Sequence, residues 1–287
     1  MFKIGLFCYN KLIIGKKSGD LYKERAMNGQ YGDDFAFVYD SLMREDYSYG
    51  DYADYIEAVF ARFGKPPEPF IADLGCGAGS MCVELASRGY DMIGIDNSPH
   101  MLAMAREKAA ASGCSEKILF LEQELGAFEL YGTVGAFIST FDCLNYITDK
   151  RRLRALFRLA GNYLAPGGFF IFDLNTPYKL EKLVKSGVFY EVTDDFCYIW
   201  QNRAGGAGGT GGANRKVVFD MTFFTKEQDG RWRRQDEIHR QRAWLPGDIA
   251  HAARGTRLET LGIYSFLGFR RPRVKAAKAS YIMKKTE

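Results

Sequence analysis

Three glycines at alternate positions, Gly75, Gly77 and Gly79, are the first residues whose spacing could hold a ligand. They follow a short apolar run that ends at Asp73-Leu74 and precede a helical pattern, so they form a turn between a strand and a helix. Glycine allows positive φ and close approach of a ligand to the backbone, while the start of the helix offers free N–H groups. Such a turn sits at the carboxyl end of a strand, where open α/β sheets bind their ligands.

The spacing of the glycines separates two classes of ligand. A dinucleotide-binding fingerprint counted from Gly75 and Gly77 requires glycine or alanine at position 80, whereas this chain has Ser80, and its third glycine stands one place early. The pattern therefore favours a ligand without a pyrophosphate, and S-adenosylmethionine (SAM), with its cationic sulfonium and amino-acid end, is of that kind. On these residues alone, a glycine turn with a purely structural role remains an alternative.

A second acidic residue supports the ligand-binding interpretation. Asp96 ends the next apolar run, about 20 residues after the glycines, where an acid can accept hydrogen bonds from ribose hydroxyls. Asp96 alone would be a weak signal, because acids often cap helices. Its position relative to the glycine turn makes the pair specific, and Asp73 is placed to order the turn and to bind the amino-acid end of the ligand.

The overall composition limits the other classes of function. The cysteines, at positions 8, 76, 82, 114, 143 and 197, form no CxxC pair, and only three histidines occur, so we expect no metal site. The net charge of +4 is too small to indicate nucleic acid by itself. No apolar run approaches the roughly 18 residues of a membrane helix. Scattered thiols without a secretion signal are typical of the reducing cytoplasm, where we expect the protein to act.

Strand and helix patterns alternate five times in the middle of the chain. Apolar runs indicate strands at 70–74, 91–95, 117–121, 133–139 and 169–172. Among the intervening helices, one opens with Ser98-Pro99, and another spans 149–164 and is closed by Pro166-Gly167-Gly168. Two more strands, 258–266 and 278–284, follow a helix at 246–254. The alternation predicts an α/β fold with a doubly wound, mostly parallel seven-stranded sheet.

An antiparallel β section interrupts this pattern. Aromatic and β-branched runs at 196–203, 217–224 and 232–244 indicate strands, with Asp229-Gly230 as a hairpin turn and the glycine-rich stretch 204–213 as a flexible tip. The chain is therefore divided into an N-terminal appendage at 1–26, an α/β ligand-binding domain at 27–184, an inserted β lid at 185–245 and a C-terminal part of the α/β domain at 246–287.

The ordered motifs resemble those of class I SAM-dependent methyltransferases. The segments that carry the resemblance are DLGCGAGS, GIDNSPHML, FLEQEL, FISTFDCLNYI and LAPGGFFIFDLNT, which cover most of residues 31–178. The N-terminal segment FAFVYDSLMREDYSYGDYADYI and the inserted β section resemble one subgroup of small-molecule N- or O-methyltransferases. That subgroup is akin to sugar N,N-dimethyltransferases and glycine N-methyltransferase. The resemblance implies a Rossmann-like fold, SAM as cofactor and a small-molecule methyl acceptor.

The resemblance also implies a set of cofactor-binding residues. Glu124-Leu125 stands where the subgroup usually has Asp-Met beside the adenine amine, and this departure puts the adenine contact in doubt. Three tyrosines of the N-terminal segment would close over the cofactor, and Tyr52 stands where relatives often have tryptophan. The implied cofactor site consists of Asp73, Gly75, Cys76, Gly77 and Gly79 at the glycine turn, Asp96, Asn97 and Met101 at the ribose and adenine, Glu124, Leu125, Ser139, and the tyrosines Tyr31, Tyr39 and Tyr52.

Methyl transfer from a sulfonium needs alignment more than covalent help, so we expect no nucleophilic residue. A base is needed only if the acceptor is an ammonium or a hydroxyl. The candidates are Asp142, Tyr146, Tyr178 and His239, although His239 could equally be a packing or surface histidine. Asn175-Thr-Pro-Tyr178 resembles the Asn-Pro-Pro-Tyr motif of amide methylases, but it follows the fifth strand instead of the fourth and lacks the first proline.

Three alternative functions remain open on the sequence. Basic clusters at 231–234 and at Arg270, Arg271, Arg273 and Lys275 would suit a tRNA or rRNA methyltransferase, although charge runs are usually solvated and no RNA-binding module is recognisable. A SAM-binding regulator without catalysis is the second alternative, and an NAD-dependent dehydrogenase is the third. We expect a small-molecule partner, no nucleic acid or membrane partner, and a monomer or homodimer.

Overall fold

The computed structural model describes residues 48–194, 196–205, 215–227 and 229–287. Within them the chain divides into two compact units, and each is described by itself. One consists of Tyr49–Pro177 with Arg242–Glu287, and the other of Tyr178–Gln241 with Ser48. The predicted appendage at 1–26, the candidate residues Tyr31 and Tyr39 and most of the glycine-rich stretch lie outside the described residues.

A seven-stranded sheet forms the first unit, in the order β10-β11-β5-β4-β1-β2-β3. The neighbouring strands of β5 through β3 pair in parallel, whereas β11 runs antiparallel to both β5 and β10. This arrangement confirms the predicted doubly wound, mostly parallel sheet. The strands are β1 Phe70–Leu74, β2 Asp91–Asp96, β3 Ile118–Glu122, β4 Val134–Ser139, β5 Leu164–Asn175, β10 Leu258–Ser265 and β11 Lys278–Lys285.

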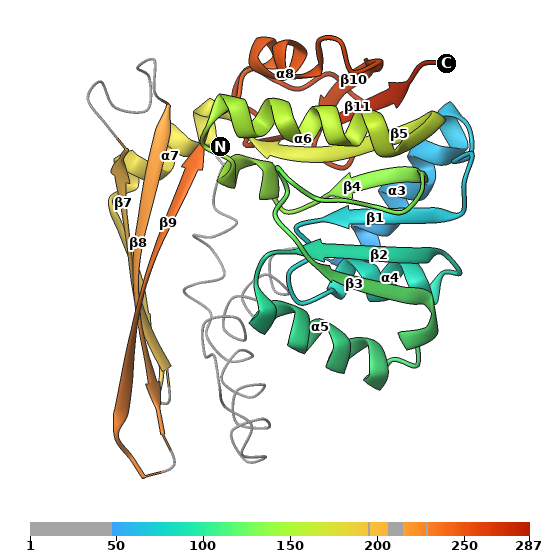
Figure 1. Cartoon of the computed structure of the whole chain (residues 1–287). Helices are drawn as coiled ribbons and strands as arrows, with labels where there is room; N and C mark the ends of the chain where they lie inside the picture. Colours follow the sequence, from blue (N-terminus) through green and yellow to red (C-terminus); the bar gives the residue numbers. More distant parts are fainter. Residues whose placement is uncertain (1–47, 195, 206–214, 228) are drawn as a thin grey trace. The chain divides into compact units, whose positions relative to one another are not determined.

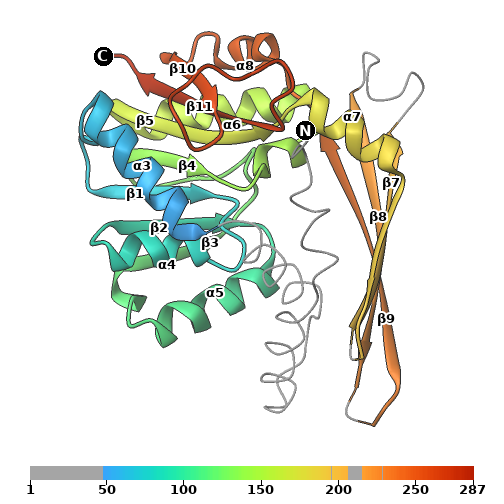
Figure 2. The same cartoon turned by 180° about the vertical axis from the view of Figure 1, so that it is seen from behind.

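Helices cover both faces of this sheet. Successive right-handed crossovers from β1 to β3 place α4 and α5 on one face, and the reversed direction from β4 to β5 places α6 on the other. Figures 1 and 2 show α3 with α4 and α5, and α8 with α6. The helices are α3 Tyr49–Phe63, α4 Ser80–Ser87, α5 Pro99–Ala111, α6 Lys150–Tyr163 and α8 Pro246–Ala253, with short 3₁₀ turns η1 Ser115–Lys117 and η2 Cys143–Tyr146.

An aromatic core lies between the sheet and the α6–α8 layer. Phe137, Phe157, Phe170 and Phe172 are buried there with Trp244. The strand predicted at 232–244 ends at Arg242, because the Trp244 indole N–H turns into this core and donates to the carbonyls of η2 and the residue after it at 3.2 and 3.1 Å. Trp244 therefore belongs to the seven-stranded unit as a core residue.

Strand β5 begins earlier than the sequence predicts. The sequence Pro166-Gly167-Gly168 was expected to separate helix from strand, yet these residues lie within β5. The pairing moves from Val134↔Leu164 directly to Ala136↔Phe169, so four residues of β5 face one residue of β4 and bulge out of register. The bulge lets a proline and two glycines occupy a strand without breaking its pairing on either side.

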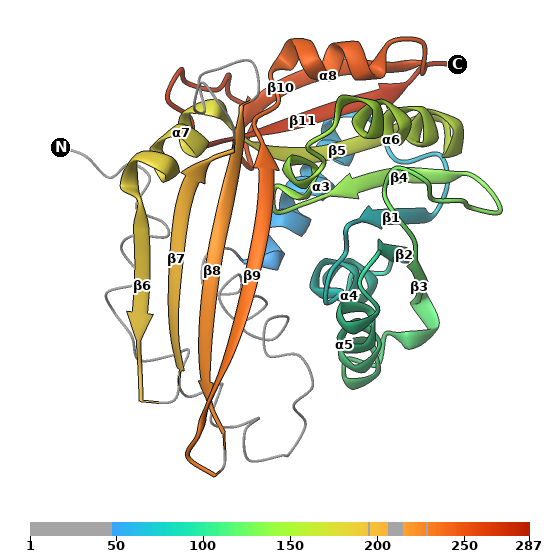
Figure 3. The same ribbon diagram turned by 60° about the vertical axis from the view of Figure 1, so that its left-hand side comes forward.

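The second unit contains a four-stranded antiparallel sheet in the order β6-β7-β8-β9, shown face-on in Figure 3. Its elements are α7 Pro177–Ser186, β6 Val188–Val192, β7 Phe196–Ala204, β8 Lys216–Lys226 and β9 Trp232–Arg242. The expected hairpin turn is confirmed, since Gly230 has a φ of 83° and its N–H donates to the Glu227 carbonyl at 2.9 Å. The sequence pattern missed α7 and β6, which are short and amphipathic.

Among the described residues, no helix is long and apolar enough to cross a membrane. The same residues contain no group of three or more histidine, cysteine or acidic side chains that could hold a metal ion.

Candidate active site

The glycine turn joins β1 to α4 and is tied to the end of β2 by its own backbone. Gly75, Gly77 and Gly79 have φ values of 79°, 51° and 71°, a conformation that other residues rarely adopt. The N–H groups of Gly75 and Cys76 both donate to the Ile95 carbonyl, at 2.7 and 3.1 Å. The turn is thus a fixed loop at the carboxyl edge of the sheet.

Asp96 connects this loop to the start of α5. One of its carboxylate oxygens accepts a hydrogen bond from the Gly77 N–H at 2.9 Å, and the other accepts from the Ser98 N–H, also at 2.9 Å. Ser98 caps α5 through a hydrogen bond from the Met101 N–H, as the sequence predicts. Each carboxylate oxygen has a second lone pair, so Asp96 keeps the capacity to accept from a ligand.

Asp73 lies at the end of β1 and is 1% exposed. Its Oδ2 accepts from the Cys82 thiol at 3.7 Å, while Oδ1 has no hydrogen-bond partner among the described residues. Burial raises the pKa of the Asp73 carboxyl to about 7. A buried carboxylate oxygen without a donor is costly, so a ligand that brings a donor to it gains free energy.

Side chains from η2 and the loop after β3 close in on the glycine turn. A Cβ on Gly75 would overlap the Cys143 sulfur and lie 3.8 Å from Leu125 Cδ1, so Gly75 is needed for packing as well as for its φ.

Glu124, next to Leu125, is exposed and pairs with Arg152 at 2.5 Å. The exposed Asn97 and the half-buried Met101 lie beyond Asp96 at the start of α5. The Ser139 hydroxyl is buried and donates to the Leu74 carbonyl at 2.8 Å, which ties β4 to β1.

Three buried charged groups meet at the carboxyl ends of β4 and β5. The Lys278 ammonium, from the start of β11, lies 2.6 Å from Asp142 Oδ1 and 3.1 Å from Asp173 Oδ2. Asp173 Oδ2 also accepts from the Asp142 backbone N–H at 2.9 Å. Burial raises the pKa of Asp173, and the Lys278 ammonium opposes that rise. Two carboxylates therefore share one ammonium in a nearly dry environment. We call these three residues the buried charge cluster.

Tyr52 of α3 joins the buried charge cluster from the other side. Its hydroxyl donates to Asp173 Oδ1 at 3.1 Å and accepts from the Phe141 N–H at 3.4 Å. The Tyr52 ring lies 4.5 Å from that of Phe141 and 5.3 Å from that of Phe266. Burial raises the pKa of Tyr52 well above its usual value, so the phenol stays protonated.

The loop after β4 has an unusual backbone. Phe141 and Asp142 have φ values of 56° and 55°, although neither is glycine. Residues held in this region cost roughly 1–3 kcal/mol each and persist where surrounding contacts impose them. Here the Tyr52 hydroxyl and the Asp173 carboxylate bind the two backbone N–H groups. Strained backbone of this kind is concentrated at functional sites.

The remaining candidate bases divide between the two units. Tyr146 ends η2 in the seven-stranded unit and is 37% exposed. Tyr178 and His239 lie in the four-stranded unit, on α7 and β9 respectively. The Tyr178 ring lies 5.2 Å from the Lys182 amine, and burial lowers the pKa of His239.

Sequence reasoning missed Asp173, Lys278 and Asn145. Asp173 ends the apolar run of β5, as Asp73 and Asp96 end theirs, so the same rule would have found it. Lys278 is the first residue of the last strand, β11. Because β11 runs antiparallel to β5, its first residue lies at the carboxyl end of β5, and the sequence alone does not reveal this direction.

Asn145 offered no readable sequence signal. Its amide nitrogen donates to the carbonyls of Asn175 and Arg242 at 3.3 and 2.8 Å, and its oxygen accepts from the Asn175 N–H at 2.8 Å.

Comparisons with known proteins agree with this architecture. Residues 71–168 match a family model described as a methyltransferase domain. A Bacillus subtilis (strain 168) protein, YqeM, classed by its name as a methyltransferase, is 32% identical over 211 residues, which are 73% of this chain and 79% of that protein.

Solved structures share the fold over most of the chain. The crystal structure of a SAM-dependent methyltransferase from Clostridium acetobutylicum ATCC 824 has 25% identity and a TM-score of 0.77, covering 88% of this chain and 98% of that one. The structure of SAM-bound CalS10 from Micromonospora echinaspora has 17% identity and a TM-score of 0.64, covering 90% of this chain and 99% of that one. At this identity the similarity is evidence for a shared fold only. With the motifs and the sheet order, these matches establish that the chain belongs to the class I SAM-dependent methyltransferases and uses SAM as its cofactor.

Proposed function

We propose that this methyltransferase transfers the methyl group of SAM to a nitrogen or oxygen atom of a small molecule. The observation that carries the choice of acceptor is the buried charge cluster, which favours a basic nitrogen. The similarity of fold to CalS10, described as an amino pentose methyltransferase, supports the same choice.

In this proposal, the cofactor occupies the glycine turn. Gly75, Cys76 and Gly77 present backbone to its amino-acid end, and Gly79 shapes the turn. The unpartnered Oδ1 of Asp73 suits an ammonium group, which is the donor that the buried oxygen lacks.

The ribose hydroxyls donate to Asp96, and the adenine lies near Asn97, Met101 and Leu125. Glu124 is a weaker candidate for the adenine contact than its neighbour Leu125, because Glu124 is exposed and paired with Arg152. Ser139 and Tyr52 act by holding the strand ends and the strained loop around the methyl group. Tyr31 and Tyr39 stay candidates for covering the cofactor.

SAM supplies a methyl group already activated on a sulfonium, so the protein contributes mainly alignment and exclusion of water. Well-oriented reactants gain roughly 7–11 kcal/mol from positioning alone. The Lys278 amine and the Asp173 carboxylate fix Asp142 in place, which makes Asp142 the best positioned of the candidate bases. Tyr146, Tyr178 and His239 remain candidates for binding the acceptor or removing its proton.

The charge balance of the cluster favours an amine over an anionic acceptor. Two carboxylates and one ammonium leave one negative charge in a buried site, where Coulomb interactions are weakly screened. A negative site stabilises the positive charge that moves from sulfur to nitrogen during transfer to an amine. The same charge would repel a carboxylate or phenolate acceptor.

The cofactor site is tested by two substitutions with matched controls. Asp96→Ala removes charge-assisted hydrogen bonds of roughly 1.5–3 kcal/mol, so we expect SAM affinity to fall about 10- to 100-fold. Gly77→Val imposes a strained φ on a β-branched residue and should weaken SAM binding similarly. Asp91→Ala, at the other end of β2, and Gly113→Val, at a positive φ after α5, are the controls. Unchanged affinity in both site variants would show that the cofactor lies elsewhere.

The acceptor is tested with labelled SAM and panels of amines, alcohols and carboxylic acids. We expect transfer to a member of the amine panel, and Asp142→Asn should lower turnover more than SAM affinity. SAM binding without transfer to any panel would favour a regulator, and transfer to tRNA instead would favour an RNA methyltransferase. Preferred methylation of a carboxylic acid would contradict the role given to the buried charge cluster.

A further inference from the structure

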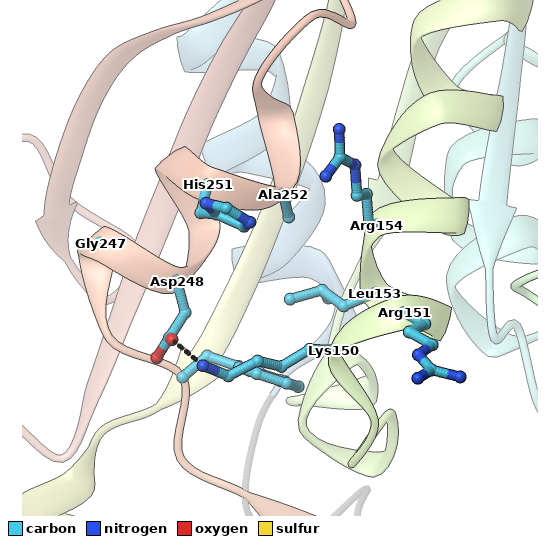
Figure 4. Close-up of a pocket in the computed structure, with 9 residues that line it drawn as sticks. Lys150, Arg151, Leu153, Arg154, Gly247, Asp248, His251 and Ala252 are labelled. Carbon is cyan, nitrogen blue, oxygen red and sulfur yellow. Dashed lines mark ion pairs between the residues drawn. The ribbon is translucent and has the colours of Figure 1, made fainter. Parts of the chain in front are cut away.

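A basic pocket outside the proposed cofactor site lies between α6 and α8. It has a volume of about 410 Å³ (Figure 4). Figure 4 shows Lys150, Arg154 and His251 extending toward the space between the two helices, whereas the Arg151 side chain points away from it. The pocket also has one carboxylate, Asp248, and so combines several cationic or hydrogen-bonding groups with a single acid.

The only acid of the pocket is already engaged. Asp248 Oδ1 lies 3.5 Å from the Lys150 amine, and its Oδ2 accepts from the Leu245 N–H at 3.0 Å, which caps α8. Arg151 and Arg154 are exposed and make no ion pair among the described residues. The pocket therefore carries positive charge that the described part of the chain does not balance.

The charge pattern of α6 opposes helix stability. Its first turn contains no acidic residue and instead has Lys150, Arg151 and Arg152 in succession after the capping Asp149. The positive end of the helix dipole disfavours cations there and favours anions. Arg152 is paired with Glu124 and Lys150 with Asp248, so Arg151 is the cation of this turn that has no ion pair among the described residues. Local choices that oppose stability are expected mainly at functional positions.

The floor of the pocket is apolar. Leu153, Trp244 and Ala252 line it and are all nearly fully buried. An inorganic ion would use only the basic rim, whereas a ligand with both an anionic group and an apolar part would use rim and floor together.

We propose that this pocket binds a small organic phosphate, with the phosphate between Lys150, Arg154 and the first turns of α6 and α8, and the apolar part over Leu153 and Trp244. Lys150 and Arg154, a lysine and an arginine four residues apart on one face of α6, suit a dianion, and helix N-termini favour phosphate. The proposal goes beyond methyl transfer and does not depend on the identity of the acceptor.

The first test compares ligands by calorimetry at low salt. Phenyl phosphate should bind saturably and more tightly than inorganic phosphate, because only the former covers the apolar floor. Arg154→Gln should weaken phenyl phosphate binding about tenfold or more, the size expected for one charge-assisted contact. Arg158→Gln, an exposed arginine on the same helix outside the pocket lining, is the matched control and should change affinity less than twofold. Equal losses in both variants would overturn the proposal, since they would indicate general surface attraction.

The second test places a charge in the pocket without removing any contact. A side chain at the exposed Gly247, in the first turn of α8, would meet no atom within 4 Å of its Cβ. Gly247→Glu should abolish phenyl phosphate binding by filling the site with a carboxylate, whereas Gly247→Gln should keep it within about threefold. Retained binding in Gly247→Glu would overturn the proposal. Binding of a short RNA that depends on Arg154, with none of phenyl phosphate, would overturn it in favour of a nucleic-acid contact.

Discussion

Lys278 is the residue on which the acceptor side of the site depends most. It is 4% exposed and is the cation shared by Asp142 and Asp173. Removing one member of a buried ion pair leaves an uncompensated charge, which is far more costly than the net gain from the intact pair. The lysine thus stabilises the strained loop after β4 through the carboxylates that hold it.

We expect Lys278→Met to lower the free energy of unfolding by about 3–5 kcal/mol. Asp142→Asn in the same chain should recover part of this loss, because it removes one of the two carboxylates left without a cation, and chemical denaturation of both single variants and the double variant measures the coupling. Lys284→Met, on the same strand but bonded to the Phe63 carbonyl, should cost clearly less. Strictly additive effects of Lys278→Met and Asp142→Asn would contradict the shared-cation arrangement.

Asp73 should make SAM binding depend on pH. Its pKa of about 7 means that the carboxyl is largely protonated at pH 6 and ionised at pH 8, and only the ionised form can pair with the cofactor ammonium. SAM affinity measured by calorimetry should therefore rise between pH 6 and pH 8, and this rise should flatten in Asp73→Asn. The same slope in the variant would assign the pH dependence to another group.

The ligand-free protein should show the opposite trend. Because folding raises this pKa from 3.8 to about 7, the protonated acid is the better fit to the folded state. The contribution of Asp73 to stability is full below pH 3.8 and is lost as the pH rises through about 7. Thermal unfolding without SAM, compared between the wild type and Asp73→Asn, measures this contribution.

At the residue scale, sequence reasoning found groups that have a local signature. Gly75, Gly77 and Asp96 were predictable because glycine spacing and an acid at a strand end follow from strand-turn-helix geometry. Lys278 binds a carboxylate 105 residues away, and Asn145 binds groups 30 and 97 residues away, which no local pattern encodes. Their roles depend on the pairing of β11 with β5 and on the return of the chain at Arg242.

At the scale of elements, the start of α5 links helix stability to the proposed ribose site. Ser98 caps the helix, its own N–H binds Asp96, and Pro99 fits the first turn. The position was read correctly from sequence because a serine followed by proline is a strong start signal. By contrast, β5 starts early because residues 165–168 bulge out of register with β4. A proline followed by two glycines usually indicates a turn, so the sequence did not predict a strand there.

We expect Ser98→Ala to destabilise the protein by about 1 kcal/mol, since the hydroxyl accepts the hydrogen bond from the Met101 N–H. The melting temperature should fall by roughly 2–4 °C. Ser112→Ala, at the other end of α5, is the matched control, because the Ser112 hydroxyl makes no hydrogen bond among the described residues. A drop of equal size in the control would assign the effect to general helix propensity.

At the scale of the whole molecule, the four-stranded unit is an insertion whose ends are joined. The chain leaves the seven-stranded unit after Pro177 and returns at Arg242, and the Asn145 amide binds carbonyls on both sides of that gap. All described residues of the proposed cofactor site lie in the seven-stranded unit. No strand of the seven-stranded sheet comes from residues 178–241.

We expect a chain in which residues 178–241 are replaced by a Gly-Ser linker of about six residues to fold and to bind S-adenosylhomocysteine. Methyl transfer by this chain measures whether the candidate residues Tyr178 and His239 are needed for the reaction. Cooperative thermal unfolding and calorimetry check the two halves of the expectation. An unfolded product would show that the seven-stranded unit depends on the insertion. If the shortened chain folds, Asn145→Ala should lower its stability, because the variant loses the hydrogen bonds to Asn175 and Arg242.

The Asn145 bridge has a consequence for how such enzymes diversify. A segment whose entry and exit points are fastened together can be exchanged, lengthened or shortened by recombination at one spot, with no strand of the parent sheet displaced. Variation in which compound is modified can then accumulate in the inserted piece while the nucleoside-binding half is inherited unchanged. The side chain of Asn145 holds the two ends of the inserted segment together at that spot.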